Sequence, residues 1–314
     1  QSLKFHKLAL KIRKTIRGHR HVDVASCYNN LGNLHADSGD YDKAIHVLSE
    51  ALQIRVAVLG EDHQQVAEVQ YNIASVYEEM EDWEQAASFY SEAYSTRSFV
   101  YGKTHSKTLD VRFRYARMLS KLERYEEAIE ELESGGRKSS GEWIMELSVA
   151  YAGEKRFTKA VECVKILIEE KETKNGQDDV NLIDPLFALS LWESQLGNQE
   201  KSLKACEDAL LVCRNNMESQ TLEYGEALKR CAMARAKAGK IDLALELLEE
   251  AIAIEEDENF EMEEGQEFRK FRALCYRQRG SILKKAKNYE EAIDALYTFC
   301  KMYGNAPETI KALN

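Results

Sequence analysis

The chain has 314 residues, of which 44% are hydrophobic and 31% are charged, and its formal net charge is -11. A protein this acidic is a poor general binder of nucleic acid, because such binding depends on neutralising phosphates with lysine and arginine. No apolar run approaches the roughly 18 residues that a membrane-spanning helix needs, and no signal peptide begins the chain, so we expect a cytoplasmic protein. The seven cysteines form no C-x-x-C pair and lie mostly among apolar residues, which is typical of reduced core thiols.

Residues 1–17 have the pattern of the second helix of an incomplete helical hairpin. Ala9 and Leu10 precede Ala51 and Leu52 by 42 residues, in the same pattern of apolar positions. The whole chain contains only two prolines, so nearly all of it can be helical. We therefore expect an amphipathic helix here, with one face left without its first helix.

Residues 24–63 contain two amphipathic patterns that are separated by a short turn. Apolar residues recur at helical spacing on both sides of this turn. The pattern returns 42 residues later, where Trp83 takes the place of Tyr41. A period of this length is typical of solenoids built from stacked helical hairpins.

Seven such hairpins follow the half repeat. The residues directly after their turns are Tyr41, Trp83, Tyr125, Phe157, Gln199, Ile241 and Tyr289. Three positions further on, a small residue recurs as Ala44, Ala86, Ala128, Ala160, Ser202, Ala244 and Ala292, and its lack of bulk lets two helices approach closely. The interval from Tyr125 to Phe157 is 32 residues instead of 42 and contains the Gly/Ser-rich stretch 134–141. This shorter interval predicts a truncated second helix or a tighter connection.

The small residues at the helix crossing and the aromatic after the turn resemble the tetratricopeptide repeat. In residues 1–130, the runs Asn29-Asn30-Leu31-Gly32, Ala51-Leu52-Gln53-Ile54-Arg55 and Leu59-Gly60-Glu61-Asp62-His63 are similar to the kinesin-light-chain variety of that repeat. Only the generic pattern continues beyond them. The resemblance implies an all-α, right-handed solenoid of about seven hairpins, with an N-terminal half repeat and a C-terminal partial helix.

The same resemblance implies one superhelical domain over residues 1–314. Its expected parts are light-chain-like repeats at 1–133, a Gly/Ser loop at 134–141, divergent repeats at 142–304 and a capping helix at 305–314. Within the divergent repeats, the acidic stretch 255–267 has the composition of a long linker.

Three histidines, His21, His63 and His105, recur every 42 residues, each three positions after a glycine. They invite a metal hypothesis, but packed helices of neighbouring repeats lie about 10 Å apart, whereas zinc–nitrogen bonds are about 2.0–2.1 Å long. We expect these histidines to help start the next helix instead. The sequence also lacks G-x-S-x-G, G-x-x-x-x-G-K-[ST] and H-E-x-x-H motifs, so we expect no enzyme, no metal and no cofactor.

The resemblance places the first helix of each hairpin on the concave surface of the solenoid. Residues at i, i+4 spacing or beside them then form the candidate peptide-binding site: Asn29, Asn33, Tyr71, Asn72, Phe113, Arg114 and Arg117. Asparagines can hold the backbone of an extended peptide through a donor and an acceptor, arginines can pair with carboxylates, and aromatics can receive an apolar anchor. The run continues through Phe187 and Arg230 in the second half of the chain.

Two members of the family suggest what such a site would bind. In kinesin light chains a groove lined by asparagines and basic residues takes short acidic peptides with an aromatic, and Asn29, Asn30, Asn33 and Asn72 match those positions. Chaperone-binding relatives clamp a terminal carboxylate with lysine, asparagine and arginine. Asn33, Asn72 and Arg117 match three of those places, but Asn29 and Phe113 stand where lysines are expected.

We therefore expect a non-enzymatic interaction scaffold or adaptor that binds a peptide segment of a protein partner, acidic and with an aromatic anchor, in the concave groove. The alternative is a structural subunit that docks laterally in a larger cytoskeletal or motor-associated assembly. In that alternative the exposed face of the first helix, with Leu8, Ile12 and Ile16, would contact the neighbour.

Overall fold

The computed structural model describes residues 2–134, 140–219, 221–254 and 262–303, with the backbone alone for 262–265 and 303. These residues form fifteen α-helices and one short 3-10 helix, and they contain no strand. Backbone contacts divide the chain into two units, Gln1–Arg156 and Phe157–Asn314, which we describe separately. The predicted all-α class is confirmed.

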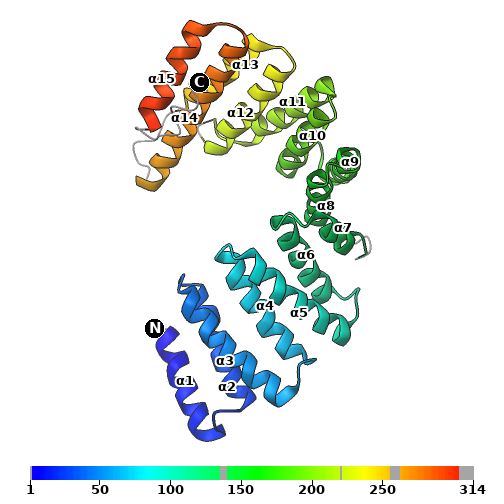
Figure 1. Cartoon of the computed structure of the whole chain (residues 1–314), viewed down its shortest axis with the longest axis vertical. Coiled ribbons are helices and arrows are strands. Elements are labelled where there is room, and N and C mark those ends of the chain that lie inside the picture. Colours follow the sequence, from blue (N-terminus) through cyan, green and yellow to red (C-terminus); the bar gives the residue numbers. More distant parts are fainter. Residues whose placement is uncertain (1, 135–139, 220, 255–261, 304–314) are drawn as a thin grey trace. The chain divides into compact units, whose positions relative to one another are not determined.

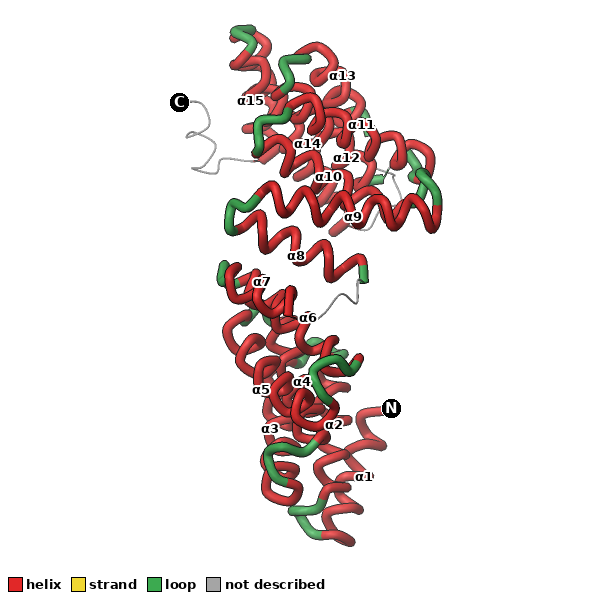
Figure 2. Tube along the Cα trace, turned by 90° about the vertical axis from the view of Figure 1, so that its right-hand side faces the viewer, coloured by secondary structure: helices red, strands yellow, loops and turns green. Residues whose placement is uncertain are grey.

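In its described part, unit 1 consists of eight helices, which are labelled in Figure 1. They are α1 (Ser2–Arg17), α2 (Val22–Ala36), α3 (Tyr41–Leu59), α4 (Gln64–Glu79), α5 (Trp83–Tyr101), α6 (Ser106–Lys121), α7 (Tyr125–Ser134) and α8 (Gly141–Gly153). Helices α2 and α3, α4 and α5, and α6 and α7 pack as hairpins, and each hairpin packs on the next. Helix α1 packs on α2, and α8 packs on α6 and α7. Short loops connect the helices of each hairpin (Figure 2).

Unit 2 also consists of helices that pack in pairs, and a short 3-10 helix connects its first two helices. Its described helices are α9 (Phe157–Asn175), η1 (Val180–Leu182), α10 (Ile183–Gln195), α11 (Gln199–Asn216), α12 (Leu222–Lys237), α13 (Ile241–Ile252), α14 (Met262–Lys285) and α15 (Tyr289–Tyr303). Helices α10 and α11, α12 and α13, and α14 and α15 pack as hairpins, and α9 packs on α10. The expected hairpin between residues 141 and 175 corresponds to α8 and α9, which belong to different units.

The acidic stretch 255–267 is not a linker over its whole length. Its last six residues, from Met262 on, form the first turns of α14, because glutamate, glutamine and methionine are good helix formers. The predicted linker is wrong for these residues, because a high density of carboxylates does not prevent a helix from forming. Residues 255–261 of the stretch and the predicted capping helix at 305–314 lie outside the described residues.

The predicted turns correctly mark where the second helix of each hairpin begins. Helices α3, α5, α7, α9, α11, α13 and α15 begin at the seven residues that the sequence places directly after its turns. The small residue three positions later is buried in all seven, and Ala44, Ala86, Ala128 and Ala160 have no exposed area. Helices α2 and α3 approach so closely that a Cβ atom on Gly32 would lie 2.4 Å from Cγ of Leu48. The helix crossings are therefore set by residues without bulk.

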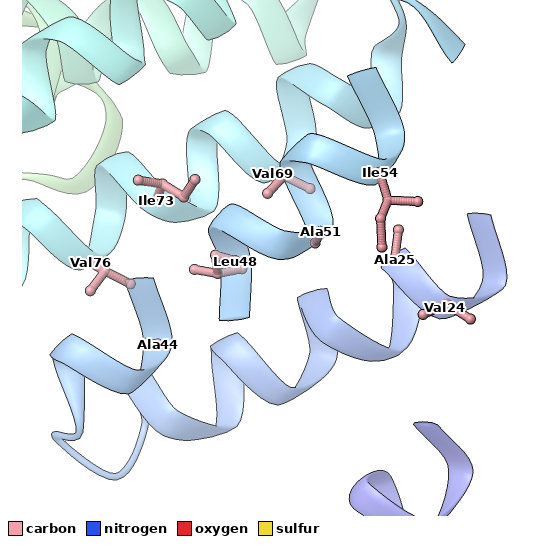
Figure 3. Close-up of a cluster of buried hydrophobic side chains, with 9 residues drawn as sticks. All are labelled: Val24, Ala25, Ala44, Leu48, Ala51, Ile54, Val69, Ile73 and Val76. Atoms are coloured by element: carbon pink, nitrogen blue, oxygen red, sulfur yellow. The ribbon is translucent and has the colours of Figure 1, made fainter. Parts of the chain in front are cut away.

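The core of the first repeat takes side chains from three successive helices (Figure 3). Its buried members are Val24 and Ala25 on α2, Ala44, Leu48, Ala51 and Ile54 on α3, and Val69, Ile73 and Val76 on α4. The first helix of the next repeat thus completes the core of the preceding hairpin. Such a hairpin needs its neighbour to bury its apolar face, as in other repeat proteins.

The three periodic histidines are helix caps. Nδ1 of His21, His63 and His105 accepts a hydrogen bond from the backbone N–H of the residue two positions later, at 3.1, 3.1 and 3.2 Å. These histidines directly precede α2, α4 and α6, and each has the extended backbone that is usual for an N-cap. Their predicted role at the start of the next helix is confirmed.

The short interval in the repeat corresponds to a short helix. Helix α7 has 10 residues, whereas α3 and α5 each have 19, so the predicted truncation of a second helix is confirmed. Ser140 is the N-cap of α8, since its Oγ accepts a hydrogen bond from the backbone N–H of Trp143 at 3.3 Å. Residues 135–139 of the predicted loop lie outside the described residues.

Candidate functional site

The predicted binding residues lie on α2, α4 and α6 of unit 1, whose common surface, continued by α8, we call the first-helix face. Nδ2 of Asn72 on α4 donates a hydrogen bond to Oδ1 of Asn29 on α2 at 2.9 Å. Asn29 is buried, whereas Asn33, one turn further along α2, is exposed. Two of the three predicted amides therefore join neighbouring repeats, and Asn33 presents the exposed amide of the group.

Glu78, in the last turn of α4, organises the two predicted arginines. Its carboxylate accepts hydrogen bonds from the Tyr90 hydroxyl at 2.7 Å, from Arg114 at 3.3 Å and from Arg117. Only 13% of the Glu78 side chain is exposed. Burial alone would raise the pKa of Glu78, but the hydrogen bond from Tyr90 and the positive charges of Arg117 and Arg114 outweigh it and lower this pKa.

Tyr71 is held on the same face by two cations. The guanidinium carbons of Arg97 and Arg114 lie 4.7 and 5.6 Å from the centroid of its ring, which is the geometry of cation–π contacts. The edge of the fully buried Tyr90 ring completes this environment, with 5.5 Å between the two ring centroids. Burial raises the pKa of Tyr71, and the nearby Asp110 carboxylate adds to that rise.

Phe113 connects α6 to α8. Its ring stacks on Trp143 with 5.7 Å between centroids, and the guanidinium carbon of Arg117 lies 6.0 Å from its centroid. Arg117 therefore contacts both the carboxylate of Glu78 and the ring of Phe113. The side chains of Arg114 and Arg117 remain 33% and 36% exposed, so part of each guanidinium is available at the surface.

A cleft of about 570 Å³ opens beside this cluster, between α4, the start of α5, α6 and α8. Its charged lining consists of the carboxylates of Glu78, Glu79, Glu81 and Glu146 and the cations of Arg117 and Lys121. Trp83, Met118 and Val149 supply most of its apolar wall. We call it the acidic cleft, because four carboxylates face two cations.

Among the predicted site residues, Arg117 alone lines the acidic cleft. Two lining residues, Glu78 and Glu146, are not among the predicted site residues. Glu78 lies seven residues after Tyr71, which is the spacing of two helical turns, so the helical period could have placed it on the first-helix face. Glu146 adjoins Met145, which the same period selects, and no sequence signal points to it.

Glu146 is a half-buried carboxylate without a cation at ion-pair distance among the described residues. Burial raises the pKa of Glu146, and the nearby Ser120 hydroxyl and the more distant charges of Arg117 and Lys121 oppose that rise only in part. Lys121 itself lies over the Trp83 ring, with 5.6 Å from Nζ to the ring centroid.

Unit 2 has a smaller cleft of about 400 Å³ between α10 and α12. It combines Phe187 and Arg230, which the sequence places on one face of the first helices, and the guanidinium carbon of Arg230 lies 5.0 Å from the Phe187 centroid. The remaining walls include Ile183, Met217 and Leu222 with the carboxylates of Asp184, Glu223 and Glu226.

Two negative findings apply to the described part of the chain. None of its helices has the length and apolar character that crossing a membrane requires. Within the same residues, no three histidine, cysteine, aspartate or glutamate side chains are grouped so as to hold a metal ion.

Comparisons with known proteins agree with this architecture. A tetratricopeptide-repeat family model matches residues 1–55, 28–98 and 65–135. A second family model, anaphase-promoting complex subunit 5, matches residues 150–229. No curated protein matches the chain.

Solved structures with the same fold include a tetratricopeptide repeat protein from Parabacteroides merdae, with a TM-score of 0.64 and 15% identity, over 92% of this chain and 97% of that one. The C-terminal part of a repeat-containing protein from Cytophaga hutchinsonii matches with a TM-score of 0.56 and 12% identity, over 91% of this chain and 99% of that one. At these identities the likeness concerns the fold. Together with the family match over residues 1–135 and the paired helices, it shows that this chain is a tetratricopeptide-repeat protein.

Proposed function

We propose that the chain is a non-enzymatic interaction scaffold that binds a peptide segment of a protein partner on the first-helix face of unit 1. The Glu78 cluster is the observation that carries this proposal. Glu78 holds Arg114 and Arg117 in place while about a third of each side chain stays exposed. Guanidinium groups that are already ordered lose less conformational entropy when they bind a ligand.

The exposed groups suit an extended peptide. Asn33 offers an amide donor and acceptor for one peptide unit, and the guanidinium edges of Arg114 and Arg117 offer donors to carbonyl or carboxylate oxygens. Phe113 and Tyr71 lie beside these donors and provide apolar surface for a side chain. Because Glu78 already offsets part of the positive charge, the arginines act here as oriented donors more than as a source of net positive potential.

The test is a random-peptide display selection on the purified chain, followed by affinity measurement with the enriched peptides. The informative variant is Glu78→Gln/Arg114→Gln/Arg117→Gln, which removes the donors without leaving a buried carboxylate unpaired. Each charge-assisted hydrogen bond is worth about 1.5–3 kcal/mol, so we expect at least about a tenfold loss of affinity.

Arg124→Gln is the matched control, because it removes an arginine whose ion pair with Glu127 is exposed and lies outside the first-helix face. This control should bind the peptides as the unchanged chain does. Undiminished affinity in a triple variant that is folded by circular dichroism would overturn the proposal.

A second candidate function is that of a subunit that docks laterally in a larger assembly. On α1, the large apolar side chains of Phe5, Leu8, Ile12 and Ile16 are exposed. Ile12 is 49% exposed, whereas Ile54, at the same place in the next repeat, is 8% exposed. The match of residues 150–229 to a family named as a subunit of a complex also favours this candidate.

Analytical ultracentrifugation tests the self-assembling form of that second candidate. A mass that rises with concentration in the unchanged chain, and that no longer rises in Leu8→Glu/Ile12→Glu, would favour it. A constant monomer mass over the accessible concentration range would count against it.

A further inference from the structure

We infer that the acidic cleft receives a lysine or arginine side chain of the bound peptide, with the cationic head between Glu81 and Glu146 and the aliphatic stem along the wall of Trp83 and Val149. This inference rests on the proposed function and names the chemistry of one anchor of the peptide. It also differs from the acidic peptide that the resemblance to kinesin light chains implies.

The balance of charge in the acidic cleft is the first observation. Glu78 pairs with both Arg114 and Arg117, so this group keeps one positive charge in excess. Glu79, Glu81 and Glu146 remain, and none of the three has a lysine or arginine within 4.0 Å among the described residues. Lys121 is the remaining cation of the lining, and its ammonium lies over the Trp83 ring. The three other carboxylates outweigh this excess and Lys121 by one charge, so the net charge around the cleft is negative.

Glu146 is partly exposed, so a ligand can reach its carboxylate. It is also partly buried, so its negative charge is unfavourable when no cation is close. Its carboxylate is half-buried on α8 and lines the cleft. An ion pair in a partly desolvated site is stronger than one in open water, because the effective dielectric constant is lower. A cation that enters the cleft would thus gain more from Glu146 than from an exposed glutamate such as Glu79.

Glu81 supplies a second carboxylate that lines the cleft and has no cation at ion-pair distance among the described residues. Glu81 lies in the turn between α4 and α5 with φ of +58°, in the left-handed region that glycine adopts without strain. Gly39 occupies the equivalent place one repeat earlier, with φ of +73°. Glu123, Lys155 and Lys287 have the same conformation at the equivalent turn positions, so the left-handed backbone belongs to the repeat and not to the cleft. At this position Glu81 adds a carboxylate to the lining of the cleft, and glycine could replace it without backbone strain.

The shape of the acidic cleft fits a long, flexible cationic side chain. A volume of about 570 Å³ lies within the usual range for ligand pockets. Lysine and arginine can lay their methylene groups on an apolar wall while their charge stays near water and carboxylates. Trp83 and the exposed Val149 supply such a wall next to Glu81 and Glu146. An acidic side chain at this place would meet uncompensated carboxylates.

The experiment uses the full chain and four display libraries of random peptides that differ only in a fixed central residue, which is Lys, Arg, Gln or Glu. We expect the Lys and Arg libraries to enrich at least about tenfold over the Gln library, as one partly buried ion pair of about 1.4 kcal/mol would require. The Glu library should enrich least. Higher salt should reduce the difference between the Lys and Gln libraries.

The informative variant is Glu81→Gly/Glu146→Gln, because neither change is expected to weaken the fold. Glycine suits the backbone at position 81, and glutamine removes a poorly compensated charge at position 146. This variant should lose the preference for Lys and Arg but still bind peptides. Glu84→Gln, which removes an exposed carboxylate near the cleft that does not line it, should keep the preference.

The outcomes separate the two proposals. Peptides that enrich equally with Gln, Lys and Arg, or a preference for Lys and Arg that survives in Glu81→Gly/Glu146→Gln, would overturn the cationic anchor and leave the scaffold function standing. A preference for Glu would place the contact on the arginines instead, and would also overturn it. No enrichment from any library would overturn both proposals.

Discussion

The side-chain amide of Asn72 on α4 donates to the side-chain oxygen of Asn29 on α2, and this 2.9 Å bond joins two successive repeats. Asn29 is 6% exposed, so the bond is sheltered from water. Replacing Asn72 by alanine leaves a buried acceptor without its partner, which costs about 1–3 kcal/mol of the free energy of unfolding. Urea denaturation of Asn29→Ala, Asn72→Ala and the double variant measures the coupling. We expect the double variant to lose less than the sum of the single changes, whereas simple additivity would show that the bond does not form in solution.

Glu78 should stabilise the fold at neutral pH and lose that effect in acid. Its pKa in the folded chain lies below the ordinary value, so its contribution is present above about pH 4.5 and fades as the pH falls through the lowered pKa. We expect Glu78→Gln to unfold at lower urea concentration than the unchanged chain at pH 7, with the difference shrinking below pH 4. A difference that is independent of pH would show that the carboxylate charge has no role.

Glu146 should behave in the opposite way. Its pKa in the folded chain is raised, so the favourable state of this group, which is protonated, is complete below about pH 4.5 and is lost as the pH rises through the raised pKa. We therefore expect Glu146→Gln to unfold at a higher temperature than the unchanged chain at pH 7 and 8, with little difference at pH 4. At neutral pH the changes in stability caused by Glu146→Gln and Glu78→Gln should therefore have opposite signs. Two changes of equal sign would contradict one of the two assignments.

Gly32 should tolerate no side chain at the crossing of α2 and α3. A Cβ atom there would lie 2.4 Å from Cγ of Leu48, which is a position that the leucine must vacate. Overpacking of this kind costs about 1–3 kcal/mol, and we expect Gly32→Ala to lower the midpoint of urea unfolding accordingly. Leu48→Ala removes the clashing atoms at the cost of a cavity, so Gly32→Ala/Leu48→Ala should be more stable than the sum of the two changes predicts. Full additivity would mean that the cost of Gly32→Ala does not come from the Leu48 side chain.

The sequence predicted the helical hairpins well because their signals are local. Helices α3 and α5 begin at Tyr41 and Trp83, where a turn ends and a new helical pattern of apolar residues starts. The histidine caps were also predictable, because His63 and its equivalents recur beside a helix end. The cysteines follow the same logic, as Cys206 and Cys213 lie at apolar positions of α11 and are buried.

The candidate site was only partly predictable because its contacts join different helices. The helical period places Arg114 and Arg117 on one face of α6, but it does not show that Glu78 at the end of α4 lies opposite them. In the same way, no local sequence pattern shows that the side-chain amide of Asn72 donates a hydrogen bond to Asn29. The sequence therefore predicted the residue types of the first-helix face, whereas the pairing within it depends on how the repeats stack.

Hydrogen–deuterium exchange of the full chain, with and without the most strongly enriched peptide, tests the central claim most directly. A peptide bound on the first-helix face should slow exchange in segments that cover α4, α6 and α8, around Glu78, Arg117 and Glu146, and the slowing should be absent in Glu78→Gln/Arg114→Gln/Arg117→Gln. Slowed exchange confined to α1, or to unit 2, would contradict the claim and would place the working surface elsewhere on the chain.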